Sequence, residues 1–384
     1  MGRMHPLREL FSSFFRLGST AFGGPAMVAH IRKTAVGKKE WLSDASFRDG
    51  VALCQMIPGA TAMQVAAYVG LRTRGIGGGA VAFTAFGLPA FLIMLILSAL
   101  YDRAHALPAV VSAFGGLQVV VVALVAHAAF TFGKNLLTDW KGPVIALAAA
   151  VMFGFSFPPI GVILIAGLCG LGLYHRQTFP ASEHTDSGSI YSLGSLPAIL
   201  VVAALLFVLL FLFQRRFFEL ALLMAKVDLF AFGGGFSSLP LMFNEVVHVR
   251  AWMDSLTFLD GIALGQVTPG PIVITATFIG YLQYGLIGSV IATVAIFLPS
   301  FLMIAGTVPY YDRLRSSSWF NRALRGILYS FVGLLVSVTI RFSLTVPWDA
   351  VRVILAAGAL AGLIFNVRLI YLVIAGIGVS VLLL

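Results

Sequence analysis

Charged residues are scarce in this chain of 384 residues, where they make up 10% of the sequence against 59% for hydrophobic residues. A soluble globular chain is about half apolar and a quarter charged. Apolar stretches of about 20 residues, long enough to cross a bilayer as a helix, follow one another almost from end to end. These runs are continuous rather than alternating, which excludes a membrane β-barrel as well as soluble enzyme folds. The sequence therefore predicts an all-α polytopic membrane protein.

Cysteine is also scarce. Cys54 and Cys169 lie in apolar segments far apart in the sequence, so neither a disulfide framework nor a thiolate metal site is indicated. Phosphate-binding loops and the common hydrolase and metalloprotease motifs are missing from the sequence. We therefore expect no catalytic residues, no cofactor and no metal. The formal net charge of +10 is attributed to basic loops that face anionic lipid, and no nucleic-acid partner is expected.

The chain contains an internal duplication. Phe22-Gly23-Gly24 recurs as Phe232-Gly233-Gly234, and the Q-x-x-P-G motif of Gln55 to Gly59 recurs as Gln266 to Gly270. The register continues through later pairs, namely Gly70 and Gly280, Gly75 and Gly285, Gly78 and Gly288, and Tyr101-Asp102-Arg103 and Tyr311-Asp312-Arg313. Such a repeat predicts two homologous halves.

Four apolar helices are expected after the Q-x-x-P-G motif of each half. They lie near 76–100, 109–131, 142–157 and 159–174 in the first half, and near 284–306, 322–341, 348–364 and 368–384 in the second. The expected organisation is an N-terminal repeat at 1–174, a polar linker at 175–195, an extra transmembrane helix at 196–213 and a C-terminal repeat at 214–384.

Loop charges predict that the two repeats have inverted topologies. The loop 31–49 carries a basic cluster, whereas its counterpart 242–260 carries only Arg250. The bias reverses on the next loop, because 101–108 carries only Arg103 and 311–325 carries several arginines. Basic loops collect on the cytoplasmic side, so equivalent loops of the two halves are expected on opposite faces of the membrane.

The first Q-x-x-P-G segment is expected to be re-entrant, because the loops on both sides of it are basic. If the F-G-G segment is re-entrant too, an odd number of crossings separates the repeats, as inversion requires. If every apolar segment crossed the membrane completely, the repeats would also be inverted, but one basic cluster would lie on the outer side of the membrane. Arg215 and Arg216 fit the re-entrant arrangement poorly.

Glycine and proline predict that both repeated motifs are breaks in membrane helices. Broken segments at equivalent places in two repeats point to a transport site, and helix amino termini at such a site attract anions. The alternative is that the glycines only let helices pack closely. The candidate substrate-binding residues are Gly23, Gly24, Pro25, Gln55, Pro58, Gly59, Gly233, Gly234, Gly235, Gln266, Pro269 and Gly270, with the repeated cations Arg16 and Lys226.

Other interpretations of the polar candidates stay open. Arg16 and Lys226 either attract a dianion or extend to the lipid headgroups. Asp49, Asp260 and Asp228 are candidates for proton coupling, because an acid within the membrane is functional by default. For Asp49 and Asp260 we prefer the interpretation that they cap helix amino termini. Asp228 has Gly18 as its counterpart, so it breaks the repeat symmetry.

With both duplicated motifs, the chain resembles the chromate ion transporter family in its long form of two homologous halves. The resemblance implies a multi-pass carrier of the inner membrane that exports chromate, confers chromate resistance and draws on the proton motive force. The chain departs from its own symmetry where Gly235 stands opposite Pro25 and Ala60 opposite Pro271. The two halves of a binding site can therefore be unequal.

The residues indicate a tetrahedral oxyanion and not which one, so chromate rests on the resemblance. The leading hypothesis is proton-linked chromate export by alternating access between the halves. The alternatives are a sulfate-like oxyanion exchanger or channel and, from another class, a membrane enzyme or scaffold without transport. The expected partners are chromate or a related oxyanion and the lipid bilayer, and a homodimer is left open.

Cysteine labelling tests the inversion. In a background without Cys54 and Cys169, single cysteines at positions 38 and 250 are expected to react with a membrane-impermeant maleimide from opposite faces, because these positions lie in equivalent loops of the two repeats. Labelling of both from the same face would contradict the inverted arrangement.

Overall fold

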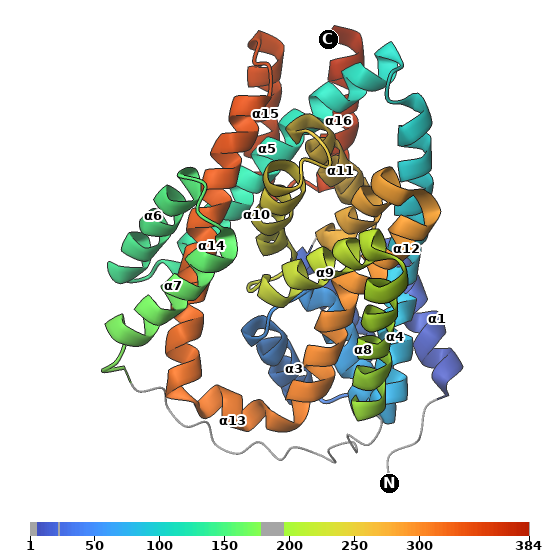
Figure 1. The fold of residues 1–384 in the computed structure, drawn as a ribbon, viewed down its shortest axis with the longest axis vertical. Coiled ribbons are helices and arrows are strands. Elements are labelled where there is room, and N and C mark those ends of the chain that lie inside the picture. Colours follow the sequence, from blue (N-terminus) through green and yellow to red (C-terminus); the bar gives the residue numbers. More distant parts are fainter. Residues whose placement is uncertain (1–5, 22–23, 178–195, 384) are drawn as a thin grey trace. The chain divides into compact units, whose positions relative to one another are not determined.

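A computed structural model of the protein describes residues 6–21, 24–177 and 196–383, with the backbone alone at 24–26. Over these residues the chain is helical, without a β-strand, and most connections are short (Figure 1). This confirms the predicted all-α fold. Most of the predicted linker, residues 178–195, lies outside the described residues.

The first repeat runs from α1 to α7. Its elements are α1 (Leu7–Thr20), α2 (Gly24–Arg32), a π-helical turn η1 (Lys33–Lys38), α3 (Asp44–Met56), α4 (Thr61–Ala104), α5 (Pro108–Leu136), α6 (Lys141–Gly154) and α7 (Pro159–Leu173). Pro108 and Pro159 stand at the first helical position, where the missing N–H costs nothing. The extra helix α8 (Leu196–Phe213) follows at the predicted position.

The second repeat follows the same order and contains additional short elements. Its elements are α9 (Arg215–Phe230), η3 (Gly235–Ser237), α10 (Ser238–Phe243), the π-helical turn η4 (Asn244–Val249), α11 (Ser255–Val267), η5 (Ile272–Ile274), α12 (Thr275–Thr307), η6 (Val308–Tyr310), α13 (Tyr311–Ser316), α14 (Ser318–Thr345), α15 (Ala350–Ile364) and α16 (Leu369–Leu383). The additional short elements are η3, η5, η6 and α13.

Fine details of the backbone repeat as well. Besides the paired π-helical turns η1 and η4, the left-handed residues Glu40 and Ala251 occupy equivalent positions, as do Ser156 and Asn366. A positive φ is uncommon for residues other than glycine. Its recurrence at matched places shows that the duplication extends to the local conformation.

A sharp bend divides both α4 and α12 into two arms. The bend lies at Gly75, with φ 62°, and at its equivalent Gly285, with φ 61°. In α4, a Cβ on Gly70 would collide with the carbonyl of Gly78, so the two arms fold back on each other. The second arms begin where the sequence predicts helices, near 76 and 284. The first arms were not predicted, and they begin directly after the Q-x-x-P-G motifs.

The predicted breaks are confirmed where the structure describes them. α3 ends at Met56 and α4 begins at Thr61, which we name the Pro58 break (57–60). α9 ends at Phe230 before the Gly234 break (231–234), and α11 ends at Val267 before the Pro269 break (268–271). Phe22 and Gly23 of the first F-G-G segment lie outside the described residues, between Ala21 and the start of α2 at Gly24.

The chain forms two compact units that do not coincide with the two repeats. The first unit comprises Met1–Leu95, Thr178–Ser238 and Thr268–Asn321, and the second comprises Ile96–Gln177, Leu239–Val267 and Arg322–Leu384. Each unit therefore contains segments from both repeats.

In the second unit, helices of different repeats pack together. In the second unit α5 lies beside α15 and α16, as Figure 1 shows. The equivalent helix α14 packs on α6 and α7, since a Cβ on Gly333 would collide with the carbonyl of Ala146 and one on Gly326 with that of Ala166. In the first unit α9 lies along α12, and α1 touches α4, because Gly18 sits against the backbone of Phe86.

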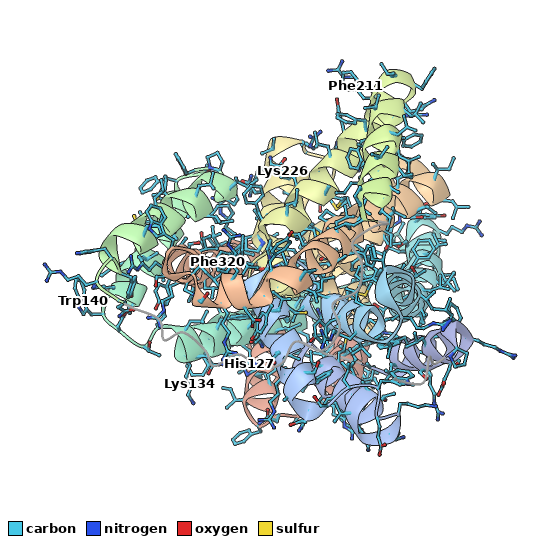
Figure 2. All side chains as sticks on the ribbon, turned by 90° about the horizontal axis from the view of Figure 1, so that it is seen from below. His127, Lys134, Trp140, Phe211, Lys226 and Phe320 are labelled. Atoms are coloured by element: carbon cyan, nitrogen blue, oxygen red, sulfur yellow. The ribbon has the colours of Figure 1, made fainter. Side chains whose placement is uncertain are left out.

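Five described helical segments are long and apolar enough to cross a membrane, and four shorter apolar helices accompany them. The long segments are Thr61–Ala104, Pro108–Leu136, Leu196–Phe213, Ile272–Ser316 and Ser318–Thr345. None of the side chains of α8 is buried, and Phe211, which is labelled on this helix in Figure 2, packs edge-on against Phe218 of α9. An apolar helix without buried side chains fits a lipid environment.

The bend in α4 allows a matched stability test. A Cβ at Gly78 would lie 2.5 Å from the carbonyl oxygen of Gly70, whereas a Cβ at the neighbouring Gly77 meets nothing within 4 Å. We expect Gly78→Ala to destabilise the protein by about 1–3 kcal/mol through overpacking. Gly77→Ala is expected to be neutral or slightly stabilising, because alanine favours helix. Thermal unfolding of both variants in detergent measures this, and equal midpoints would contradict the close approach of the arms.

Candidate substrate site

Crossed backbone hydrogen bonds join the breaks of the two repeats within the first unit. The N–H of Gly59 donates to the carbonyl of Ala231 over 2.9 Å, and the N–H of Gly270 donates to the carbonyl of Ala21 over 3.0 Å. Gly59 is the equivalent of Gly270, and Ala21 is the equivalent of Ala231. Each repeat therefore supplies the acceptor that the broken helix of the other repeat needs.

Glycine is required at both donors of these bonds. Gly59 has φ 118° and Gly270 has φ 117°, a region that residues with a side chain rarely adopt. A Cβ at Gly59 would also collide with the Ser300 hydroxyl, and one at Gly270 would lie 2.6 Å from the Cβ of Ala90. The glycine of each Q-x-x-P-G motif thus provides both the turn and the space.

The Gly234 break lies against the helices that follow the other two described breaks. A Cβ at Gly234 would lie 3.2 Å from the hydroxyl of Thr61, the first residue of α4, and one at Gly235 would lie 2.8 Å from a methyl of Ile272. Both partners belong to the first turn of a helix, where N–H groups have no acceptor within the helix. The first unit therefore gathers broken backbone from both repeats around two helix starts.

A buried polar chain lies at one of the crossed junctions. The Ala60 N–H donates to the Ser300 hydroxyl over 2.9 Å, and that hydroxyl donates to Oδ1 of Asp228 over 2.9 Å. Asp228 and Ser300 are both fully buried. The other carboxylate oxygen of Asp228, Oδ2, has no hydrogen-bond partner among the described residues.

Gln64 adds a second polar side chain to this junction. It is fully buried, and its Nε2 donates to the carbonyl of Pro58 over 2.6 Å, which holds the Pro58 break. Its Oε1 has no partner within the described part of the chain. Nε2 of Gln64 and the Ser300 hydroxyl both lie close to Gly59, so the two side chains converge there.

The equivalent junction of the other repeat lacks the whole polar chain. Gly18 stands opposite Asp228, Ala90 opposite Ser300 and Pro271, which has no N–H, opposite Ala60. A buried donor or acceptor without a partner lowers the stability of the folded protein by about 1–3 kcal/mol. Loss of one group of the polar chain therefore favours replacement of the other groups by apolar residues. The asymmetry that the sequence shows at single positions is thus one coherent difference.

The sequence-predicted candidates fall into three groups in the structure. Brought together at the junctions are Pro58, Gly59, Gly233, Gly234, Gly235, Pro269 and Gly270. Gln55 is exposed at the end of α3, Gln266 is half-buried near the end of α11 in the second unit, Arg16 is exposed on α1 and Lys226 is half-buried on α9 (Figure 2). Gly23 lies outside the described residues, and Gly24 and Pro25 are described by backbone alone in α2.

The preferred interpretation of Asp49 and Asp260 as helix caps is wrong. Both lie inside their helices, since α3 begins at Asp44 and α11 at Ser255. The caps are Ser43, whose hydroxyl accepts from the Ser46 N–H, and Asp254, whose carboxylate accepts from the Thr257 N–H. Serine and aspartate one position before each helix satisfy the free N–H groups and leave the later acids available for other contacts.

Asp49 and Asp260 instead meet equivalent tyrosines. In the second unit the Tyr101 hydroxyl donates to Asp260 over 2.8 Å, and Nε2 of Gln118 donates to its other oxygen over 2.7 Å. In the first unit the Tyr311 hydroxyl lies 3.5 Å from Asp49, with an Arg315 nitrogen 3.8 Å away. Buried Asp260 thus has two neutral donors, whereas part-exposed Asp49 has a cation.

Sequence reasoning missed Gln64, Ser300, Tyr101 and Gln118. A signal existed for the tyrosine, because Tyr101 and Tyr311 stand in the repeated Y-D-R motif. No comparable signal exists for Ser300, whose repeat counterpart is alanine and whose partners lie far away in the sequence.

The basic loop of the first repeat is held by an exposed ion cluster. The carboxylate of Asp44 pairs with Arg48 on α3 and with Arg32 at the end of α2. Hydrogen bonds from Arg48 and Arg32 lower the pKa of this carboxyl below its usual value. The cluster fixes the entry of α3 and leaves the positive charge of the loop in excess.

The fold and the junction show that the chain is a multi-pass membrane protein with two repeats whose broken helices meet. The family model described as Chromate transporter matches residues 8–171 and 218–381, once for each repeat, and the chain belongs to that family. This membership places the chain among transporters rather than enzymes.

Individual relatives agree with the family. The chain is 45% identical over 343 residues to an uncharacterized transporter of Methanocaldococcus jannaschii, covering 89% of this chain and 85% of that protein. It is 32% identical to the chromate transport protein of Pseudomonas aeruginosa, covering 86% and 80%, and 30% identical to that of Cupriavidus metallidurans, covering 80% and 76%. No solved structure matches the chain.

Removal of one tyrosine hydroxyl tests the contacts of the two acids. Tyr101→Phe takes one of two donors from a buried carboxylate and is expected to destabilise the protein by about 1–3 kcal/mol. Tyr311→Phe is the matched control, with an expected cost below about 0.5 kcal/mol, because its contact is long and half-exposed. Thermal unfolding in detergent compares the two. Equal effects would contradict the unequal environments of Asp49 and Asp260.

Proposed function

We propose that the protein exports chromate across the inner membrane, with the oxyanion bound where the breaks of the two repeats meet in the first unit. The observation that carries the proposal is the pair of crossed hydrogen bonds, from Gly59 to Ala231 and from Gly270 to Ala21. They unite the broken segments of both repeats, the arrangement typical of a transporter substrate site. The names of the relatives in Pseudomonas aeruginosa and Cupriavidus metallidurans supply chromate as the substrate.

The chemistry of the junction suits an anion. Backbone N–H groups at the start of α4, next to Gly234, carry the positive end of the helix dipole. Gly234 and Gly235 let a ligand approach the backbone closely. Lys226, Arg16 and Gln55, which belong to the same unit, are the side chains that we assign to the same oxyanion, through positive charge or amide hydrogen bonds.

Alternating access is supported by the repeat architecture. The bends at Gly75 and Gly285 are equivalent, and each separates a short arm beside a break from a long membrane helix. If the repeats are inverted, exchanging the conformations of the two halves opens the site alternately to either side.

The membrane potential favours the export of a dianion. Moving one elementary charge through 100 mV is worth about 2.3 kcal/mol, so a dianion gains about 4.6 kcal/mol when the inside is negative. That energy corresponds to roughly three orders of magnitude in concentration ratio. The electrical part of the proton motive force can therefore drive chromate outward.

Sulfate is the competing substrate, because it is also a tetrahedral dianion. The contacts at the junction suit both anions equally, so competition by sulfate belongs in the transport experiment. A homodimer finds no support in the comparisons.

Uptake of radiolabelled chromate into inverted membrane vesicles tests the proposal, because uptake there corresponds to export. We expect accumulation that collapses when the membrane potential is abolished. Gly234→Ala is expected to lower the initial rate by roughly tenfold or more, because the residue has φ 100° and a side chain would reach Thr61.

The matched control is Gly358→Ala on α15, where a Cβ meets nothing within 4 Å. This variant is expected to transport at the wild-type rate. Sulfate flux without chromate flux would contradict the assignment of chromate as the substrate. Equal transport rates for Gly234→Ala and Gly358→Ala would contradict the proposed location of the site.

A further inference from the structure

We propose that Asp228 binds one proton together with the oxyanion, and that the chain has one such proton site although it has two repeats. This inference rests on the proposed function and adds to it the group that carries the proton. Its basis is the buried polar chain at the junction of Gly59 and Ala231, together with the absence of that chain from the equivalent junction.

The first argument is that the two carboxylate oxygens of Asp228 differ in their hydrogen bonds. Oδ1 of Asp228 accepts from the Ser300 hydroxyl, whereas Oδ2 is buried without a partner among the described residues. A charged carboxylate with one bare oxygen is costly in a dry interior. A proton on Oδ2 removes the charge and converts that oxygen into a donor.

The second argument is that the groups facing Asp228 are uncharged. From α12 the facing group is Ser300, and from the Pro58 break it is the Ala60 amide, with Gln64 beside them. The described groups that interact directly with the Asp228 carboxylate belong to Ser300 and Ala60 and are uncharged. On α9 itself the nearest charge is Lys226, which lies two residues earlier and thus about 200° around the helix axis.

The third argument is the position of Asp228 relative to the proposed oxyanion. The polar chain ends at the N–H of Ala60, and the next residue, Thr61, begins α4 beside Gly234. A dianion at this helix start and a charged Asp228 repel each other through a medium of low dielectric constant. The anion therefore binds best when the carboxyl is neutral, and by linkage the anion favours binding of the proton.

The number of proton sites follows from the repeat comparison. Gly18, Ala90 and Pro271 replace all three members of the chain at the other junction. Asp49 and Asp260, the remaining candidates, have donors for their carboxylates from Tyr311, Tyr101 and Gln118. One proton then accompanies each dianion, so each transport cycle moves one net negative charge outward, and the membrane potential supplies half the energy that it would supply to the bare dianion. Acidity on the cytoplasmic side promotes binding for export, and acidity on the outer side opposes release.

The test measures chromate affinity against pH for purified protein, at pH values where chromate itself is the dianion. For the wild type we expect the affinity for chromate to fall about tenfold for each pH unit above the pH at which Asp228 loses its proton. The reason is that one proton is linked to each bound anion. Asp228→Asn mimics the protonated carboxyl and is expected to bind chromate with no pH dependence. It is also expected to retain exchange of chromate for chromate across vesicles.

Two further variants complete the design. Asp102→Asn makes the same chemical change at an exposed residue and is expected to keep the wild-type pH slope. Ser300→Ala installs the residue of the other repeat and removes the donor to charged Asp228. The fall of its chromate affinity with rising pH is therefore expected to begin at a higher pH than in the wild type, because the charged carboxylate has lost a stabilising donor.

The inference is overturned if Asp228→Asn keeps the wild-type slope, if it is folded but does not bind chromate, or if the wild-type slope corresponds to two protons. A wild-type protein that binds chromate without pH dependence overturns the inference alone. A wild-type protein that neither binds nor transports chromate overturns the proposed function.

Discussion

Backbone N–H and C=O groups that leave a helix at membrane depth must find another partner, because lipid offers none. In this protein the partner comes from the other repeat: Gly59 bonds to Ala231, and Gly270 bonds to Ala21. The requirement explains why the breaks of both repeats occur in one unit and why glycine stands at both donors. It also explains why the first unit contains segments of both repeats, since the N–H groups of Gly59 and Gly270 each use an acceptor from the other repeat.

The duplication determines the backbone architecture, and a local departure from the repeat symmetry places polar groups at only one of the two junctions. Bends, π-helical turns and left-handed residues recur with closely similar geometry in both halves. Against this regular frame, one junction carries Ala60, Ser300 and Asp228, and the other carries residues that can neither donate nor accept at those places. In the proposed substrate site, one junction is therefore polar and the other is apolar.

Much of the fold could be predicted from the sequence because its signals are local. Apolar runs predict the helices, and repeated glycine and proline predict the breaks and the starts of the long arms near Gly75 and Gly285. The roles of Asp49 and Asp260 could not be predicted. Their partners Tyr311 and Tyr101 are distant in sequence, and the capping preference applies only to a residue just before a helix, where Ser43 and Asp254 stand. Ser300 and Gln64 gave no pattern, since a single buried polar residue resembles many others.

An electron cryo-microscopy map of the protein in lipid nanodiscs with chromate tests the central claim most directly. The account predicts density for a tetrahedral anion within hydrogen-bonding distance of backbone amides at the start of α4 and next to Gly234, with the crossed bonds of Gly59 and Gly270 intact. Breaks that pack against lipid, with the anion bound elsewhere, would contradict it.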